Sequence, residues 1–422
     1  MRMIDEIIRQ ASANEYNIPI FGYDEWQDLK AQFKTEGELH DGVDTILPAI
    51  QRWIANEKPA LPIVRPTVEE MEKCFNSLLN MKWKNSVRTV ELDTVRNKFD
   101  EQVDISHVVS CGHNFNSVSN HFQCDNRYTC GHATAESSQW AWDNPFSGRT
   151  RSMLLYLWRE FKDEPSPIDE DKYRCMFRLS GYVATQFKPA VAKTIYEMES
   201  AKKVIDISCG WGDRLAGFYT SSRTEEYLGC DPNKESYEIY KKQCIAYEEL
   251  LQSPLFPEEV TFEDHGDWFE VKGHKRVRIY NRPAEDIDWD TVCETKHDLM
   301  FTSPPYFGIE KYAEGSDCED MQSWKRYNDY GIWRDTFFYP VMDAMQRNCD
   351  KVMINIVDPL VKGKRHPVEH DIRSRYGIAD IVGMPIAKRP LSDDNTTNYS
   401  VDTDEGEKRV TFIEPIYVLD KP

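Results

Sequence analysis

The segment from Lys203 to Leu215 constrains the fold more than any other part of the sequence. Val204 to Ile207 is a short apolar run rich in β-branched residues, which is typical of a buried strand. Gly210 and Gly212 follow, and glycines permit a tight turn and the close approach of backbone to a ligand. An apolar pattern with helical spacing begins at Leu215. A strand, a glycine turn and a helix in this order predict the first unit of an open α/β sheet that binds its ligand at the strand tips.

Further candidate strands follow at the spacing that such crossovers need, and several end in polar residues. The second strand ends at Asp231, where a carboxylate can accept hydrogen bonds from both hydroxyls of a ribose. The third ends shortly before Glu285, and the fourth runs from His297 to Thr302. Later strands are predicted at 353–357 and 411–419. The alternation of strands and helices predicts a mostly parallel sheet.

The fourth strand leads directly into Ser303-Pro304-Pro305-Tyr306. Each proline fixes its own φ and restricts the residue before it, so this segment is stiff and its carbonyl groups stay free. Carbonyl and hydroxyl oxygens can accept hydrogen bonds from a planar amine, while a tyrosine ring can stack on the same group. The segment therefore predicts a pocket for an amine-bearing ring.

In their order, these motifs resemble those of the S-adenosylmethionine-dependent DNA methyltransferases that act on the exocyclic amine of cytosine or adenine. The resemblance covers 176–422 and includes the segment 185–189, which is similar to the part of the family that covers the methionine end of the cofactor. It departs from the family pattern by the inserted Phe187 and by Ile207 in place of proline. The resemblance implies an α/β, Rossmann-like class I methyltransferase sheet with a separate amino-terminal accessory domain.

The resemblance also implies which residues act. The implied cofactor-binding residues are Lys188, Pro189, Asp206, Ser208, Gly210, Gly212, Asp231, Glu285 and Thr302. The implied catalytic residues are Ser303, Pro304, Pro305 and Tyr306.

Serine at the first position of the catalytic motif favours N4 of cytosine in DNA, as in a site-specific enzyme of a restriction–modification system. N6 of adenine, an RNA base and a protein amide remain alternatives, and a non-catalytic binding protein of the same fold is the remaining one. The chain has 72 acidic and 52 basic residues and a net charge of −20, whereas DNA-binding enzymes usually present a basic face. The densest basic region of the catalytic half, 362–389, is either a phosphate-contacting surface or an ordinary solvated face.

The sequence predicts two domains: 1–170 as an accessory or target-recognition region and 171–422 as the methyltransferase domain. The acidic, proline-punctuated segment 163–171 is the predicted linker. Amphipathic helices are predicted at 67–81 and 152–161, and 391–408 is predicted to be an exposed loop.

Cysteines and histidines gather between 110 and 132, and the set Cys111, His113, Cys124 and Cys130 could hold zinc. The spacing matches no standard zinc finger, and a glycine-turned loop with unligated histidines is the alternative. The sequence shows no signal-peptide pattern and no apolar run long enough for a membrane span, and its 11 cysteines are scattered. We expect a cytoplasmic protein, and we make no prediction of its oligomeric state.

Overall fold

The computed structural model describes residues 31, 36–61, 63–110, 112, 115–133, 135–161, 172, 182–253, 259–386, 400–403 and 406–421. The chain divides into two compact units. One comprises Met1–Arg65 and Cys124–Thr185, and the other comprises Pro66–Gln123 and Gln186–Pro422.

The smaller unit is helical. Its helices are α3 (Glu36–Glu57), α6 (Ser138–Asp143) and α7 (Gly148–Phe161), and it also includes the second half of α5 (Ser117–Thr129) and the short strand β4 (Gly131–His132). Trp142 of α6 is buried, and its indole N–H donates to the carbonyl of Pro59 at 2.8 Å. The helix predicted at 152–161 is confirmed as the larger part of α7.

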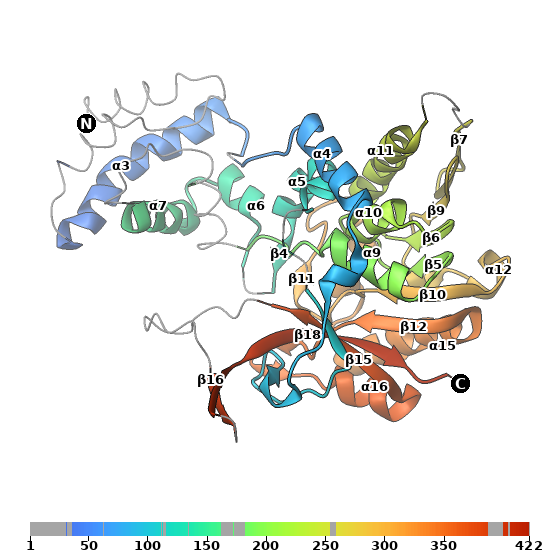
Figure 1. Ribbon diagram of the computed structural model, residues 1–422. Helices are drawn as coiled ribbons and strands as arrows, with labels where there is room; N and C mark the ends of the chain where they lie inside the picture. Colours follow the sequence, from blue (N-terminus) through green and yellow to red (C-terminus); the bar gives the residue numbers. More distant parts are fainter. Residues whose placement is uncertain are drawn as a thin grey trace. The chain divides into compact units, whose positions relative to one another are not determined.

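The larger unit is built on one sheet, in the order β1-β3-β15-β18-β12-β10-β5-β6-β9-β8-β7, with β2 paired to β18 (Figure 1). The strands on one side of β5 and β5 itself are β1 (Val87–Arg88), β2 (Val95–Arg96), β3 (His107–Val109), β5 (Lys203–Asp206), β10 (His297–Thr302), β12 (Cys349–Asn355), β15 (Ile378–Pro385) and β18 (Thr411–Leu419). Those on the other side are β6 (Glu226–Cys230), β7 (Thr261–Asp264), β8 (Trp268–Lys272) and β9 (Arg276–Tyr280).

The helices of this unit are α4 (Val68–Leu79), α9 (Pro189–Met198), α10 (Asp213–Thr220), α11 (Lys234–Leu251), α12 (Trp289–Val292), α13 (Ser323–Arg326), α14 (Tyr330–Trp333), α15 (Tyr339–Asn348) and α16 (Val368–Tyr376). A π-helical turn (Arg334–Phe338) joins α14 to α15, and 3₁₀ turns lie at Trp83–Ser86, Leu92–Thr94, Ala284–Asp286 and Glu319–Met321. Small hairpins are formed by β13 (Leu360–Val361) with β14 (Lys364–Arg365) and by β16 (Ser400–Thr403) with β17 (Gly406–Arg409).

Successive residues of the central strands feed two separate cores. Val204 and Phe301 belong to the core that also contains residues of α4, α9, α10 and α11. Ile205 and Met300, which alternate with them, belong to the core that contains residues of α12, α15 and α16. Because side chains alternate along a strand, this pattern places helices on both faces of the sheet, as Figure 1 shows.

The central strands β9, β6, β5, β10 and β12 are parallel, so their carboxyl ends share one edge of the sheet. The last strand, β18, runs antiparallel between β12 and β15. This arrangement confirms the Rossmann-like α/β sheet expected from the sequence. It also brings the start of β18 to the edge where the parallel strands end.

The predicted division near residue 170 is corrected for 66–123. This stretch belongs to the unit that contains the sheet, since β1, β2 and β3 join the sheet and α4 supplies Phe75 and Leu78 to its first core. The helical spacing of 67–81 predicted α4 correctly, including its cap at Thr67, but it carried no information on what the apolar face covers. The predicted linker, 163–171, lies outside the described residues.

The carboxyl-terminal predictions had mixed outcomes. The strand predicted at 411–419 is confirmed as β18. Part of the predicted loop 391–408 is instead the β16–β17 hairpin, while 391–399 lie outside the described residues. Among the helices that the structure describes, none is long and apolar enough to cross a membrane.

Packing of α9 against α10 gives a stability test. A methyl group added at Gly217 would lie 2.6 Å from Cβ of Ala192 and 2.8 Å from the carbonyl oxygen of Pro189. Gly217→Ala should therefore lower the free energy of unfolding by about 1–3 kcal/mol, as overpacked core sites do. Denaturant unfolding measures this. Gly148→Ala is the control, because nothing lies within 4 Å of a methyl group there, and it should unfold like the parent. Parental stability of Gly217→Ala would contradict the close packing of these helices.

Candidate active site at the strand tips

The turn after β5 has the conformation that its glycines predict. Gly210 and Gly212 have φ of 57° and 71°, in the left-handed region that favours glycine. A side chain at Gly212 would overlap the amide of Gln243, which donates to the Gly212 carbonyl at 3.1 Å. The turn leads directly into α10, with Gly212 as the residue before the first helical turn. The backbone of Gly210–Gly212 is thus open to close approach from the strand-tip side.

Asp206, the last residue of β5, is fully buried and surrounded by donors. Its Oδ2 accepts from Arg214 Nε at 2.8 Å and from the Tyr227 hydroxyl at 2.7 Å. Its Oδ1 accepts from Thr302 Oγ1 at 2.8 Å and from the Ser208 backbone N–H at 3.3 Å. The carboxylate therefore joins β5, β6, β10 and α10. A direct contact of Asp206 with a cofactor stays a prediction.

Ser208 connects the glycine turn to the segment after β10. Its hydroxyl donates to the carbonyl of Ser303 at 2.7 Å and lies 3.1 Å from the hydroxyl of Thr302. The predicted cofactor loop and the predicted acceptor loop are therefore in direct contact. Three of the predicted residues meet at this one point.

Asp231 lies at the tip of β6, beside the glycine turn. Its carboxylate accepts from the backbone N–H groups of Gly210 at 2.8 Å and Asn233 at 2.9 Å, and from the Tyr240 hydroxyl at 3.3 Å. Burial raises the pKa of Asp231 to about 6, although the two backbone donors oppose that shift. A carboxylate has about four acceptor positions, so one remains for an incoming hydroxyl without any rearrangement.

Glu285 lies in the 3₁₀ turn after β9 and is half-buried. Its Oε1 accepts from the Tyr327 hydroxyl at 2.5 Å and lies 3.3 Å from Arg326. Burial raises its pKa. The structure thus connects this turn to the stretch that follows the acceptor loop, a connection that the sequence did not suggest.

The segment 185–189 leads into α9, where Lys188 precedes the helix and Pro189 occupies its first turn. The Gln186 amide donates to Asp213 Oδ1 at 2.8 Å and to the carbonyl of Asn116 at 2.8 Å. Asp213 also accepts a hydrogen bond from Ser119. The expectation that Asp213 caps α10 is wrong, because its side chain contacts these groups and no side chain caps that helix.

The acceptor loop follows β10. Pro304 is buried, whereas Ser303, Pro305 and Tyr306 are half-buried. The Tyr306 hydroxyl donates to Glu414 Oε1 in β18 and lies 3.4 Å from the Asn355 carbonyl at the end of β12. Burial and the charge of Glu414 raise the pKa of Tyr306 well above its usual range. Sequence analysis missed both partners, although a glutamate within an apolar strand is a usable signal.

Phe307 was considered as a second residue that could hold the acceptor ring, and the structure corrects this. It is buried in the second core, with ring centroids 5.7 Å from Tyr330 and 5.0 Å from His366. Trp333 is fully buried in the same cluster. These rings support the loop from behind, so Tyr306 alone of the motif's aromatic residues remains a candidate for stacking.

The basic region 362–389 is largely neutralised in the part that the structure describes. Arg365 pairs with Asp358 at 2.7 Å and with Glu101 at 2.5 Å. Arg373 pairs with Glu369 at 2.9 Å, and Arg375 with Asp343 at 2.6 Å. Lys388 and Arg389 lie outside the described residues. The arginines that the structure describes in this region therefore do not form a free phosphate-contacting surface.

The zinc prediction gains no support from the described residues. Among them, no group of three or more His, Cys, Asp or Glu side chains is arranged to hold a metal ion. Cys111 and His113 lie outside the described residues. Cys124 and Cys130 are buried, and the Cys124 thiol lies 3.7 Å from the carbonyl of Val64.

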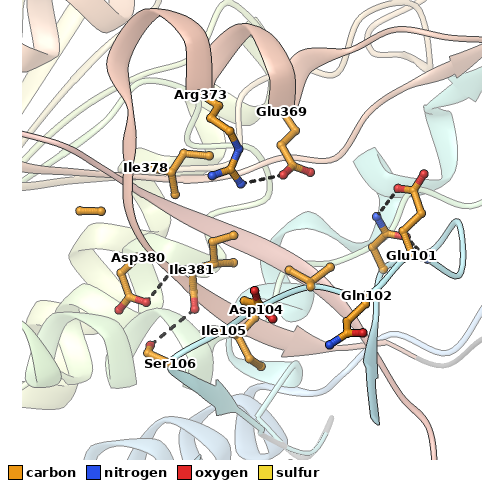
Figure 2. Close-up of a pocket in the computed structure, with 13 residues that line it drawn as sticks. Glu101, Gln102, Asp104, Ile105, Ser106, Glu369, Arg373, Ile378, Asp380 and Ile381 are labelled. Atoms are coloured by element: carbon orange, nitrogen blue, oxygen red, sulfur yellow. Dashed lines mark hydrogen bonds and ion pairs between the residues drawn. The ribbon is translucent and has the colours of Figure 1, made fainter. Parts of the chain in front are cut away.

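A cavity of about 570 Å³ lies apart from the predicted residues, between the 97–106 segment, α16 and the start of β15. Figure 2 shows Arg373 paired with Glu369 on one side of it and the acidic side chains of Asp104 and Asp380 on the other. None of the predicted site residues lines this cavity.

The buried carboxylate at the tip of β5 yields a second stability test. Asp206→Asn would leave the Arg214 guanidinium buried without its charge partner, which typically costs about 3–5 kcal/mol. We expect denaturant unfolding to show a loss of this size. Glu225→Gln is the control, since it breaks an ion pair with Lys202 in which both side chains are more than 60% exposed, and it should unfold like the parent. Equal effects of the two substitutions would contradict the structural role of Asp206.

No protein-family model matches the sequence, and no curated protein matches it. Solved structures with a related chain path include a proposed RNA methyltransferase from Pyrococcus horikoshii, at 11% identity over 55% of this chain and 82% of that one, with a TM-score of 0.29. TrmN from Thermus thermophilus is similar at 8% identity over 56% of this chain and 49% of its own, with a TM-score of 0.30. Trm1 from Pyrococcus horikoshii, solved with S-adenosyl-L-methionine, is similar at 14% identity over 56% of each chain, with a TM-score of 0.28. The chain thus spans about half the length of TrmN and of Trm1. TM-scores this low carry no argument on activity, so the case for function rests on the site residues themselves.

Proposed function

We propose that this chain is an S-adenosylmethionine-dependent methyltransferase that acts on the exocyclic amine of a nucleic-acid base. The observation that carries the proposal is the contact between the glycine turn and the acceptor loop through Ser208 and Ser303. A methyl transfer requires donor and acceptor to be held a few ångströms apart and in line, and this contact fixes the two loops against each other.

The residues present fit the cofactor. S-adenosylmethionine would supply an electrophilic methyl group. The Gly210–Gly212 backbone leaves room where a side chain at Gly212 would overlap Gln243, and Asp231 beside it holds a carboxylate suited to ribose hydroxyls. Glu285 follows the next strand tip, on the side where the resemblance expects the adenine.

On the acceptor side, the chain's own groups can hold and activate an amine. The Ser303 hydroxyl and the Pro304 carbonyl are acceptors for its two N–H groups. Hydrogen bonds in these directions favour a pyramidal nitrogen with a more available lone pair. The ring of Tyr306, fixed through its hydroxyl by Glu414, offers a stacking surface for the base.

Among possible acceptors we propose N4 of cytosine in DNA, on the strength of Ser303, with N6 of adenine as the variant within the same class. An RNA base or a protein amide is the second candidate. It is favoured by the net charge of −20 and by the ion pairs that occupy Arg365, Arg373 and Arg375. Nucleic-acid affinity would then depend on residues other than these arginines.

Asp231 gives a test of the cofactor site. Asp231→Ala should weaken S-adenosylmethionine binding by about 1.5–3 kcal/mol, the range for lost charge-assisted hydrogen bonds. In the parent, the ionised form accepts the hydroxyl donors, and the pKa of Asp231 is raised to about 6. Affinity should therefore rise as the pH rises through about 6, by up to about tenfold per pH unit below that value, and level off above it.

Titration calorimetry measures both effects. Asp231→Asn should flatten the pH dependence, whereas the control Asp335→Asn, which breaks an exposed ion pair with Arg334, should keep the parental affinity and profile. Unchanged affinity in Asp231→Ala would remove this residue from the cofactor site.

Tyr306 gives a test of the acceptor pocket. Tyr306→Ala removes the stacking surface, worth about 1–3 kcal/mol per base, and leaves the glycine turn untouched. Turnover with unmodified DNA and labelled cofactor should fall by roughly one to two orders of magnitude, since each 1.36 kcal/mol is about tenfold in rate. Ser303→Ala should damage the chemical step more than the binding of the base. Calorimetry on the same variants should show the parental affinity for the cofactor. Parental turnover of Tyr306→Ala would place the acceptor pocket elsewhere.

A further inference from the structure

Three side chains form a continuous hydrogen-bond chain that leads away from the predicted amine position. The Ser303 hydroxyl donates to the Tyr306 oxygen, a bond that by itself lowers the pKa of Tyr306. The Tyr306 hydroxyl donates in turn to Glu414 Oε1. Each hydroxyl carries one proton, so both protons of this chain point toward Glu414. The lone pairs of Ser303 therefore stay available to the N–H of an acceptor amine.

Glu414 is held in place from several elements. It is half-buried in β18 and followed by Pro415, whose carbonyl accepts from the Asn355 amide at 3.1 Å. A hydrogen bond to Asn355 and the nearby ammonium groups of Lys98 and Lys188 lower the pKa of Glu414, but burial, the largest effect, raises it.

The charged surroundings extend a little further. Glu310 acts on Tyr306 and raises its pKa. Asp358 and Arg365, which pair with each other at 2.7 Å, act on Lys98 in opposite directions. Burial lowers the pKa of Lys98, and the charge of Glu414 raises it. The carboxylate thus faces two lysines and its hydrogen-bonding neighbours rather than open water alone.

We propose that Glu414 accepts the proton released by the acceptor amine, by way of the hydroxyls of Ser303 and Tyr306. The inference rests on the proposed function. When the amine gains a methyl group it becomes positively charged, and one of its N–H bonds must break to give the neutral product. Carbonyl groups such as that of Pro304 can hold such a proton but do not take it up, so a base is needed.

The step balances without any redox partner. The amine N–H bond breaks and its electron pair stays on nitrogen, while the Ser303 oxygen gains that proton and passes its own to the Tyr306 oxygen. Tyr306 passes its own proton to the Glu414 carboxylate. The two hydroxyls end as they began, the amine is neutral and Glu414 carries the proton until it is lost to solvent.

Glu414→Gln tests this directly, because glutamine keeps the size and an oxygen acceptor for Tyr306 but cannot take up a proton. In single-turnover methyl transfer to DNA we expect a loss of roughly 100-fold, the low end of the contribution of a general base. The parental rate should rise with pH as Glu414 ionises and then level, whereas the variant should lack that rise. Affinities for cofactor and DNA should stay parental, so that the loss falls on the rate and not on KM.

Tyr306→Phe is the second variant, because it keeps the ring and breaks the chain of hydroxyls. It should reproduce the loss and the flattened profile, and the double variant should be no slower than either single one, since both interrupt the same path. Glu369→Gln is the matched control. The Tyr417 hydroxyl of the same strand, β18, donates to Glu369 at 3.1 Å, so this variant removes a tyrosine–glutamate bond outside the site and should keep the parental rate and profile.

The outcomes separate the two proposals. A parent that binds the cofactor but methylates no nucleic-acid base overturns the proposed function and the relay with it. A parent that methylates, together with Glu414→Gln and Tyr306→Phe variants that keep its rate and pH profile, leaves the proposed function in place and overturns the relay alone. If Glu414→Gln does not fold, the Tyr306→Phe rate and profile decide.

Discussion

The site depends on one buried carboxylate. Asp206 is fully buried at the tip of β5, and it accepts hydrogen bonds from Arg214, Tyr227 and Thr302, which come from α10, β6 and β10. A charge in this position would be strongly destabilising without partners, so the four-donor arrangement holds the strand tips and the helix start in one geometry. The same interaction sets the positions of the glycine turn and of the acceptor loop, because each begins within a few residues of a group that Asp206 holds.

A second constraint is the direction of the last strand. Because β18 runs antiparallel beside β12, its early residues lie at the edge where the parallel strands end. That direction places Glu414 against Tyr306 and brings the short strand β2, paired to Thr411 and Phe412, to the same region. Residues from the two ends of the larger unit's sequence therefore meet at the acceptor side, where the proposed chemistry occurs.

The local features of this site were predictable from the sequence, and the long-range ones were not. A glycine turn after an apolar run, an acid at Asp231 and the stiff segment after Thr302 are all properties of a few consecutive residues, so pattern reasoning found them. The pairing of Tyr306 with Glu414 joins residues more than a hundred positions apart, and no local pattern encodes it. For the same reason the helix α4 was predicted correctly while its place against the sheet was assigned to the wrong domain.

Charge was the least predictable property. The arginines of the basic region read as a phosphate-binding surface in sequence, but Arg365, Arg373 and Arg375 each face an acidic partner in the fold. A count of charges along a segment does not record which ones are paired across it. With 72 acidic residues in the chain, pairing is the usual outcome for a cation here, and an arginine's isolation in sequence says little about its availability.

The most direct test of the account is to incubate the full chain with S-adenosylmethionine carrying a trideuterated methyl group and a mixture of unmodified DNA and RNA, followed by digestion and nucleoside mass spectrometry. The account predicts deuterated methyl on the exocyclic amine of a base, with N4-methylcytosine in DNA as the product. Methylated adenine or an RNA product would keep the amine chemistry and overturn the choice of substrate. A chain that binds the cofactor and transfers no label to any exocyclic amine would contradict the central claim.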